Sequence, residues 1–308
     1  MDFTIIAYKN FKNALKNQGF CFMTFSEYLT EPSKKAIVLR HDIDKLPFNS
    51  LEFAKIQAKA GIRGTYYFRA VPETWDEAVI KEIAGMGHEV GYHYEDVSIM
   101  AGRRQTRGGD GGSGRGRDED FEKELAKTAI ESFASNLQRL REIAPVKTIC
   151  MHGSPMSKWD SRLLWRYYNY HDFGIIGEPY FDVNFEDVLY LTDTGRRWDG
   201  GTVSIRDKGL GIRDEGLGEE VYKDWKVKPV LGSLMNMTPE SLDFQSKYKF
   251  RSTSDIIKAA EEGMLPDKMM MTFHPQRWTD RPIPWIREPV WQNVKNVAKY
   301  FIVKVNSE

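Results

Sequence analysis

Acidic residues and histidines gather where short hydrophobic segments of this chain end. The apolar segment 36–39 runs directly into Arg40-His41-Asp42-Ile43-Asp44, and segments 87–95, 148–152 and 269–274 each lead from apolar or β-prone residues to a histidine. Only His171 of the six histidines lies outside these four segments. Because α/β sheets and barrels build their sites at the carboxyl ends of strands, the pattern predicts a site assembled from several strands.

The first segment could bind a cation and supply a base. Asp42 and Asp44 are separated by one residue, so their side chains point to the same side of an extended strand. When two carboxylates lie close together, one can bind a cation while the other acts as a general base. His41 points the opposite way, and we expect it to be packed or hydrogen-bonded rather than reactive.

The later histidines divide into one candidate ligand and several open cases. His93 could bind the same ion, and mixed nitrogen and oxygen ligation suits zinc or another divalent transition metal. His88 lies beside a helix stop, which favours a structural role. His152 and His274 end later strands and could reach the same site, but each taken alone is equally well explained as a hydrogen-bonded core histidine.

Alternating strand and helix patterns must position these groups. An αβα preface occupies about residues 1–35, with Ser26 as a possible N-cap. The predicted strands that follow are 36–44, 64–69, the segment near Val90, 147–152, 174–177, 188–193 and 268–274, and the predicted helices are 48–60, 74–86, 121–143, 161–170, 254–263 and 290–300. Such alternation favours a parallel sheet or a (β/α) barrel, here as one domain over 1–308.

Composition narrows the class of protein. Lys+Arg and Asp+Glu both number 44 among 308 residues, so the net charge gives no reason to expect a nucleic-acid partner. The Gly/Arg-rich stretch over about 101–118 is predicted to be a flexible insertion. Cys21 and Cys150 show no pairing or metal spacing and are expected to be buried thiols, as in a reducing compartment. With no leader-like start and no long apolar run, we expect a cytoplasmic protein without a membrane partner.

Residues 36–100 resemble the polysaccharide deacetylase (NodB-homology) family of metal-dependent carbohydrate esterases. His41-Asp42-Ile43-Asp44 looks like a spaced version of the family's first acidic motif, which implies that Asp42 is the base and Asp44 a metal ligand. Gly87-His88-Glu89-Val90-Gly91-Tyr92-His93 matches the family's Gly-His-Glu-x-Gly-x-His, which implies that His93 is a ligand. This second match is the most specific in the chain.

One position departs from the family pattern. The family's second metal histidine stands four residues after the first, and here that residue is Val97, which cannot bind a metal. Either Glu95, Asp96 or His152 completes the site, or the ion is weakly bound or absent. The family's late histidine corresponds to His274, which the resemblance implies is the general acid.

The resemblance also implies a fold and a reaction. The implied fold is a distorted (β/α)7 barrel. The implied reaction is the hydrolysis of an amide or ester of a sugar-containing small molecule, in which a divalent metal, zinc in the first place, activates the water. Candidate substrate-binding residues are Arg69, Asp193, Arg197, Trp198 and Arg277, although large aromatic residues and arginines more often serve packing and solvated surfaces. The alternatives are a metal-independent C–N hydrolase, for which Val97 argues, and a catalytically inactive carbohydrate-binding barrel. The sequence does not determine the oligomeric state.

Overall fold

The protein was analysed as a computed structural model that describes residues 1–106, 115–153, 159–198 and 238–286. The chain divides into two compact units, which are described separately. Unit 1 comprises Met1–Cys21, Ser33–Ile37 and the described residues after Asn184, and unit 2 comprises Phe22–Pro32 and Val38–Val183. The expectation of one domain over 1–308 stays a prediction.

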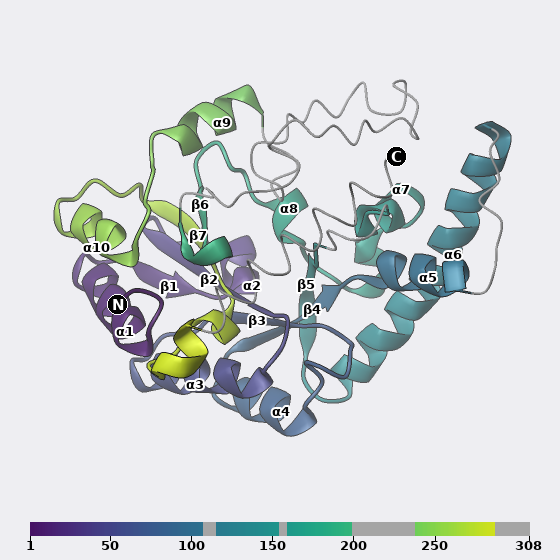
Figure 1. The fold of residues 1–308 in the computed structure, drawn as a ribbon. Coiled ribbons are helices and arrows are strands. Elements are labelled where there is room, and N and C mark those ends of the chain that lie inside the picture. The colour runs from purple at the N-terminus through teal and green to yellow at the C-terminus, as the bar shows by residue number, and fades with distance from the viewer. Residues whose placement is uncertain (107–114, 154–158, 199–237, 287–308) are drawn as a thin grey trace. The chain divides into compact units, whose positions relative to one another are not determined.

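Unit 2 contains four parallel strands, seen in Figure 1 as β2 to β5. They are β2 (Ala36–Ile43, whose first two residues belong to unit 1), β3 (Thr65–Phe68), β4 (Glu89–Tyr94) and β5 (Val146–Met151). They pair in the order β2-β3-β4-β5. Every residue of β2 is buried, and its first half, 36–39, has the apolar character expected of a central parallel strand.

Helices precede, connect and follow these strands, and a glycine ends two of them. They are α2 (Phe25–Thr30), α3 (Pro47–Lys59), α4 (Glu77–Gly85), α5 (Asp96–Thr106), α6 (Arg115–Arg141), α7 (Leu164–Tyr167) and α8 (Pro179–Asp182), with 3₁₀ turns η1 (Ser161–Leu163) and η2 (Tyr170–Phe173). Gly61 and Gly87 follow α3 and α4 with φ of 66° and 85°, a backbone conformation that glycine adopts without strain. Thr24, rather than Ser26, caps α2, in a capping box with Glu27.

Three residues of the Gly-His-Glu-x-Gly-x-His motif have structural roles. His88 accepts a hydrogen bond from Gly64 N at 3.2 Å and lies 3.0 Å from Ala54 O, which confirms its predicted structural role. The Glu89 carboxylate accepts hydrogen bonds from Thr65 Oγ1 (2.8 Å), Thr148 Oγ1 (2.6 Å) and Ser26 N (3.0 Å). Gly91 lies against the ring of Tyr67, where a Cβ atom would collide with the ring carbons.

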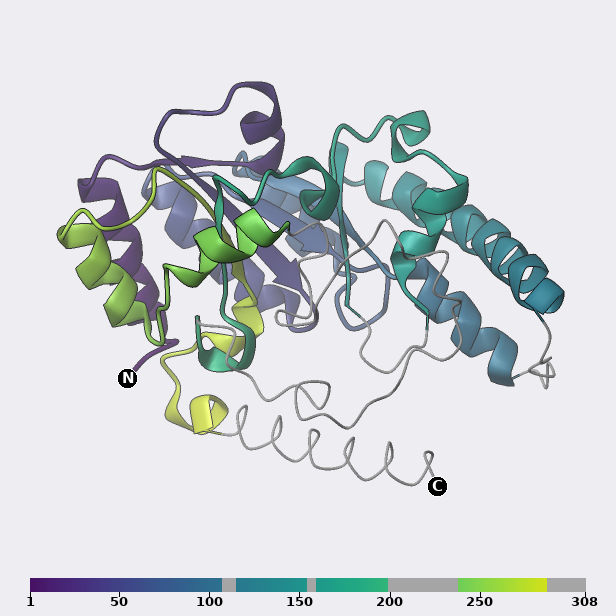
Figure 2. The ribbon, with the colours of Figure 1, turned by 90° about the horizontal axis from the view of Figure 1, so that it is seen from above.

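Unit 1 has its own strand pair and helices. These are α1 (Ile5–Asn17), β6 (Leu189–Thr192), α9 (Pro239–Ser246), α10 (Thr253–Glu261) and β7 (Lys268–Phe273), with η3 (Thr194–Arg196) and η5 (Pro275–Arg277). Strands β6 and β7 are parallel, and Ala36 N, at the start of β2, donates to Asp267 O at 2.8 Å just before β7. Cys21, the first residue of β1 (Cys21–Met23), donates to Lys35 O at 2.9 Å. Helices α1 and α10 lie side by side, as Figures 1 and 2 show.

The predicted α/β class with a mostly parallel sheet, here of seven strands, is confirmed. Residues 174–177 do not form a strand and contribute only a bridge between Thr148 and Gly177, while 161–170 forms short helical turns instead of one continuous helix. Helix covers both ends of the stretch expected to be a flexible insertion, since α5 continues through Thr106 and α6 begins at Arg115. Residues 107–114, 154–158, 199–237 and the expected helix 290–300 lie outside the described residues.

Two smaller expectations can also be compared with the structure. Cys150 is buried, but Cys21 is exposed, because it occupies an outward position of the short strand β1. Within the four described ranges, no helix has the length and apolar character that crossing a bilayer requires.

Candidate functional site

The strand register brings polar residues to one edge of the sheet in unit 2. Ile43 pairs with Phe68, so the next residues, Asp44 and Arg69, are neighbours beyond the strand ends. In the same way Tyr94 pairs with Met151, which makes Glu95 and His152 neighbours. Hydrogen bonds continue the pattern, since Arg69 Nη1 donates to Asp44 O at 3.1 Å and His152 N donates to Tyr94 O at 2.9 Å.

Asp44, His93 and His152 form a group that could hold a metal ion. Asp44 Oδ1 lies 3.8 Å from His93 Nε2 and 3.4 Å from His152 Nε2, and the three atoms lie within 4.8 Å of one another. The side chains of Asp44 and His152 are 25% and 18% exposed, so the group is accessible from one side. Two imidazole nitrogens and one carboxylate oxygen are a ligand set for divalent transition metals that leaves coordination positions open.

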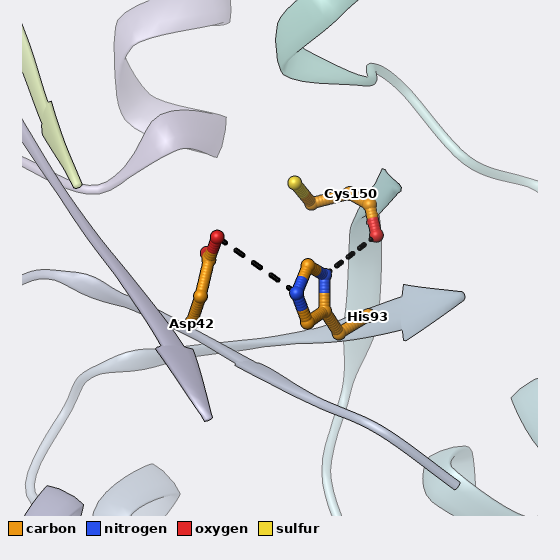
Figure 3. A group of neighbouring side chains, drawn as sticks. All are labelled: Asp42, His93 and Cys150. Carbon is orange, nitrogen blue, oxygen red and sulfur yellow. Dashed lines mark hydrogen bonds and ion pairs between the residues drawn. The ribbon is translucent and has the colours of Figure 1, made fainter. Parts of the chain in front are cut away.

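His93 is held in the form that binds metals. Its Nδ1 lies 2.9 Å from Cys150 O, and because a carbonyl only accepts, Nδ1 carries the proton and Nε2 carries the lone pair (Figure 3). Burial lowers the pKa of His93 to about 4, despite the nearby carboxylates of Asp42 and Asp44. The ring is therefore neutral near pH 7, with its lone pair directed at the carboxylates.

His152 lies between two carboxylates. Its Nε2 faces Asp44, and its Nδ1 lies 3.1 Å from Glu95 Oε2, an ion-pair contact without good hydrogen-bond direction. Burial alone would lower the pKa of His152, but its contacts with Asp44 and Glu95 raise it to about 9. Burial would likewise raise the pKa of Glu95, but His152 and Arg69 hold it below its usual value. Without a metal ion, His152 is an imidazolium that bridges two carboxylates.

Asp42 is locked in place by an arginine that the sequence interpretation missed. Arg40 Nε donates to Asp42 Oδ1 at 2.8 Å and Arg40 Nη2 donates to Oδ2 at 2.6 Å, while Nη2 also lies 3.2 Å from Tyr180 Oη. Asp42 Oδ2 remains near the candidate centre, 3.8 Å from His93 Nε2. The signal was available, since residues 40 and 42 share one side of an extended strand.

A second possible metal group shares His93 and consists of Asp42, His93 and Cys150, all buried. Figure 3 shows the Asp42 carboxylate and the Cys150 carbonyl on opposite sides of the His93 ring. Burial raises the pKa of the Cys150 thiol well above its ordinary value, so the thiolate that a metal needs is disfavoured. The guanidinium of Arg40 on Asp42 also repels a cation at that point. Asp44 with the two histidines is therefore the better fit to a metal ion.

The structure distinguishes among the three residues proposed to replace the missing ligand at Val97. Val97 itself is fully buried. The Asp96 carboxylate accepts hydrogen bonds from Tyr92 Oη (2.7 Å), Ser132 Oγ (2.8 Å) and Asn136 Nδ2 (2.9 Å), and burial raises its pKa. Asp96 thus joins α5 to α6. Glu95 contacts the outer nitrogen of His152, so only His152 faces both Asp44 and His93.

Unit 1 holds a separate polar cluster around the fully buried Asp193. Its carboxylate accepts from His274 Nδ1 (2.6 Å), His274 N (2.9 Å), Arg277 Nη1 (3.1 Å) and Trp278 Nε1 (2.6 Å). Burial alone would raise the pKa of Asp193, but the charges and hydrogen bonds of His274 and Arg277 hold it below its usual value. His274 therefore carries a proton on Nδ1 and donates it in a hydrogen bond to Asp193. This bond sets the tautomer and the orientation of the ring.

The remaining substrate-binding candidates lie in different surroundings. Arg69 and Arg277 are held by Glu95 and Asp193 respectively. Trp198 is 2% exposed, packs against Phe3, Phe11, Phe273 and Trp278, and donates to Thr253 Oγ1 at 3.1 Å. Stacking on a sugar needs an exposed ring, so the expectation for Trp198 is corrected to core packing. Arg197 is half-buried.

Comparison with known proteins identified no relative: no protein-family model, curated protein or solved structure matches the chain. The resemblance to polysaccharide deacetylases therefore rests on the motif residues alone and stays a prediction.

Proposed function

We propose that this chain is a metal-dependent hydrolase that cleaves an amide, or an ester, of a sugar-containing small molecule. The observation that carries the proposal is the convergence of Asp44, His93 and His152, with the proton of His93 fixed on the far nitrogen by Cys150 O. A histidine whose outer N–H is bound to a carbonyl presents its other nitrogen as a ligand, as in known metal sites. The similarity of residues 36–100 to the deacetylase motifs supplies the type of reaction.

Asp44, His93 and His152 would hold the ion, and we propose zinc because mixed nitrogen and oxygen ligation suits it. A divalent ion bound there would polarise a carbonyl and make water a stronger acid. Asp42 would accept a proton from that water, since its carboxylate lies 3.8 Å from His93 Nε2. Two hydrogen bonds from Arg40 fix the orientation of the Asp42 carboxylate. A base held in one orientation does not have to be ordered when the substrate reacts.

On the resemblance alone, His274 is proposed as the proton donor to the leaving group. The contact compatible with this role is with Asp193, which holds the Nδ1 proton of His274 and leaves Nε2 as the atom that can exchange a proton. A distorted (β/α)7 barrel and a cytoplasmic location belong to the same proposal and rest on the motif resemblance and on the sequence.

The first test is the metal content of the purified protein, measured by elemental analysis after incubation with zinc and removal of unbound ions. The wild type should carry about one ion per chain, and Asp44→Ala, His93→Ala and His152→Ala should each lose it, because each removes one of three protein ligands. His171→Ala is the matched control, since the His171 ring contacts Tyr170 and Ile175 O, neither of which is a candidate ligand. The loaded protein is then assayed for acetate release from acetylated amino sugars.

The outcomes separate the candidate functions. Metal binding together with hydrolysis that fails in Asp42→Asn supports the proposal. Hydrolysis by a protein that binds no metal would instead identify a metal-independent C–N hydrolase. Sugar binding that survives Asp42→Asn, with no hydrolysis in any protein, would identify a carbohydrate-binding barrel.

A further inference from the structure

Arg69 and Glu95 connect Asp44 and His152, the two more exposed residues of the candidate metal centre. Arg69 Nε donates to Glu95 Oε1 at 2.6 Å, and Arg69 Nη2 lies 2.6 Å from the same oxygen. The remaining nitrogen, Nη1, donates to the main-chain oxygen of Asp44 at 3.1 Å. The other oxygen of Glu95 lies 3.1 Å from Nδ1 of His152. One arginine thus reaches Asp44 directly and His152 through Glu95.

The strand register of the sheet places these residues next to one another. Arg69 follows β3 and neighbours Asp44 after β2, while Glu95 follows β4 and neighbours His152 after β5. Glu95 is also two residues after His93, so both side chains leave the end of β4 on the same side. The register of β2 against β3 and of β4 against β5 therefore places Arg69 beside Asp44 and Glu95 beside His152.

We propose that Glu95 positions His152, and that Arg69 positions both Glu95 and Asp44, for binding the ion; the inference rests on the proposed metal centre. Glu95 Oε2 makes an ion-pair contact at 3.1 Å with the outer nitrogen of His152, and a carboxylate at that nitrogen orients the ring of a ligating histidine and makes its inner nitrogen a stronger donor. Arg69 holds that carboxylate through a planar fork, a geometry that a lysine ammonium does not reproduce.

Two other roles for these residues fit the contacts less well. Glu95 as a direct ligand would have to leave both Arg69 and His152, because each of its oxygens is already held by one of them. Arg69 as a clamp for a substrate anion would have to release Glu95 or the Asp44 main chain, since Nε, Nη1 and Nη2 all make contacts and the side chain is only 19% exposed.

The test measures the affinity of the full chain for Zn²⁺ and Co²⁺ by competition with a chelator at fixed neutral pH. Glu95→Gln keeps the size of the side chain but removes its charge, and Arg69→Lys keeps the charge but removes the fork. We expect each to weaken binding by about 10- to 100-fold, as loss of an outer-shell partner does, and His152→Ala to weaken it further. We also expect the visible absorption bands of bound Co²⁺ to shift in Glu95→Gln, because the donor strength of His152 changes.

Glu122→Gln is the matched control. Glu122 is a buried carboxylate paired with Arg166 at 3.1 Å, and its side chain is 9% exposed against 8% for Glu95. It differs from Glu95 in its partner, because the ion pair at 3.1 Å joins Glu122 to Arg166, which is not a candidate ligand. This variant should bind both ions as the wild type does, and thermal unfolding would verify that every variant folds.

The outcomes distinguish this inference from the proposed function. If the wild type binds metal and His152→Ala does not, but Glu95→Gln matches Glu122→Gln in affinity and spectrum, the positioning role is overturned and the metal centre stands. If the wild type binds neither ion, the proposed function falls and this inference falls with it. If Glu95→Gln fails to fold, wild-type affinity in Arg69→Lys overturns the positioning role.

Discussion

Replacing Arg40 should destabilise this protein more than replacing any exposed cation. The Arg40 side chain is 2% exposed, and its partner Asp42 is 6% exposed. Arg40→Met would remove two hydrogen bonds to Asp42 and one to Tyr180 while roughly conserving volume. The Asp42 carboxylate would then be buried without its counter-charge, a change that typically costs about 3–5 kcal/mol. That is a large fraction of the about 5–15 kcal/mol by which proteins are stable.

The assay is urea unfolding followed by circular dichroism, with the slope of the transition used to check that the folded and unfolded states remain comparable. Lys55→Met is the matched control, because Lys55 and Glu82 form a similarly short pair at 2.7 Å whose side chains are 50% and 48% exposed. Exposed pairs of this kind contribute about 0–1 kcal/mol. The double variant Arg40→Met/Asp42→Leu should regain most of the loss, since removing both charges leaves none buried alone.

Equal unfolding free energies for Arg40→Met and Lys55→Met would refute the reasoning. The pair would then not hold a buried charge, and the fixed orientation assigned to Asp42 as a base would lose its support. A double variant as unstable as Arg40→Met would show instead that the loss comes from packing around residue 40.

Three further predictions follow from other parts of unit 2. Gly91→Ala should lower the free energy of unfolding by about 1–3 kcal/mol through overpacking against Tyr67. Gly85→Ala is the control and should not lower it, because no atom lies within 4 Å of the Cβ position of Gly85. Thermal unfolding compares the two variants. Burial raises the pKa of Glu178 to about 8 from an ordinary 4.5, so between these values the folded state binds more protons and stability falls as pH rises; Glu178→Gln should lack this slope in urea unfolding. Because the pKa of His152 is about 9 in the metal-free protein, metal binding near neutral pH should release about one proton. Calorimetry of metal binding in two buffers of different ionisation enthalpy measures this release. Equal binding enthalpies in the two buffers would contradict the prediction.

Much of the candidate site could be predicted from the sequence because it depends on local patterns. An apolar run that ends in Asp42 and Asp44 identifies a buried strand and the residues at its carboxyl end, since side chains alternate regularly along a strand. The same reasoning found His93, gave His88 a structural role and predicted the alternation of strands and helices. Arg40 belonged to the same local pattern, and its pairing with Asp42 could have been predicted from the spacing alone.

Contacts between strands required the tertiary structure. Glu95, Asp96 and His152 were equal candidates in the sequence, and the register of β4 against β5, together with the packing of α6, assigned them three different environments. Trp198 is buried by aromatic residues from distant parts of unit 1, which no local pattern indicates.

The sequence by itself therefore determined which residues stand at strand ends and what chemistry their side chains could do. Only the tertiary structure decided that His152 faces Asp44, that Glu95 lies behind His152, and that Asp193 holds His274. The physical reason is that side-chain direction along a strand is set by the backbone of neighbouring residues, whereas the partner across a sheet is set by register between segments as far apart as residues 44 and 152.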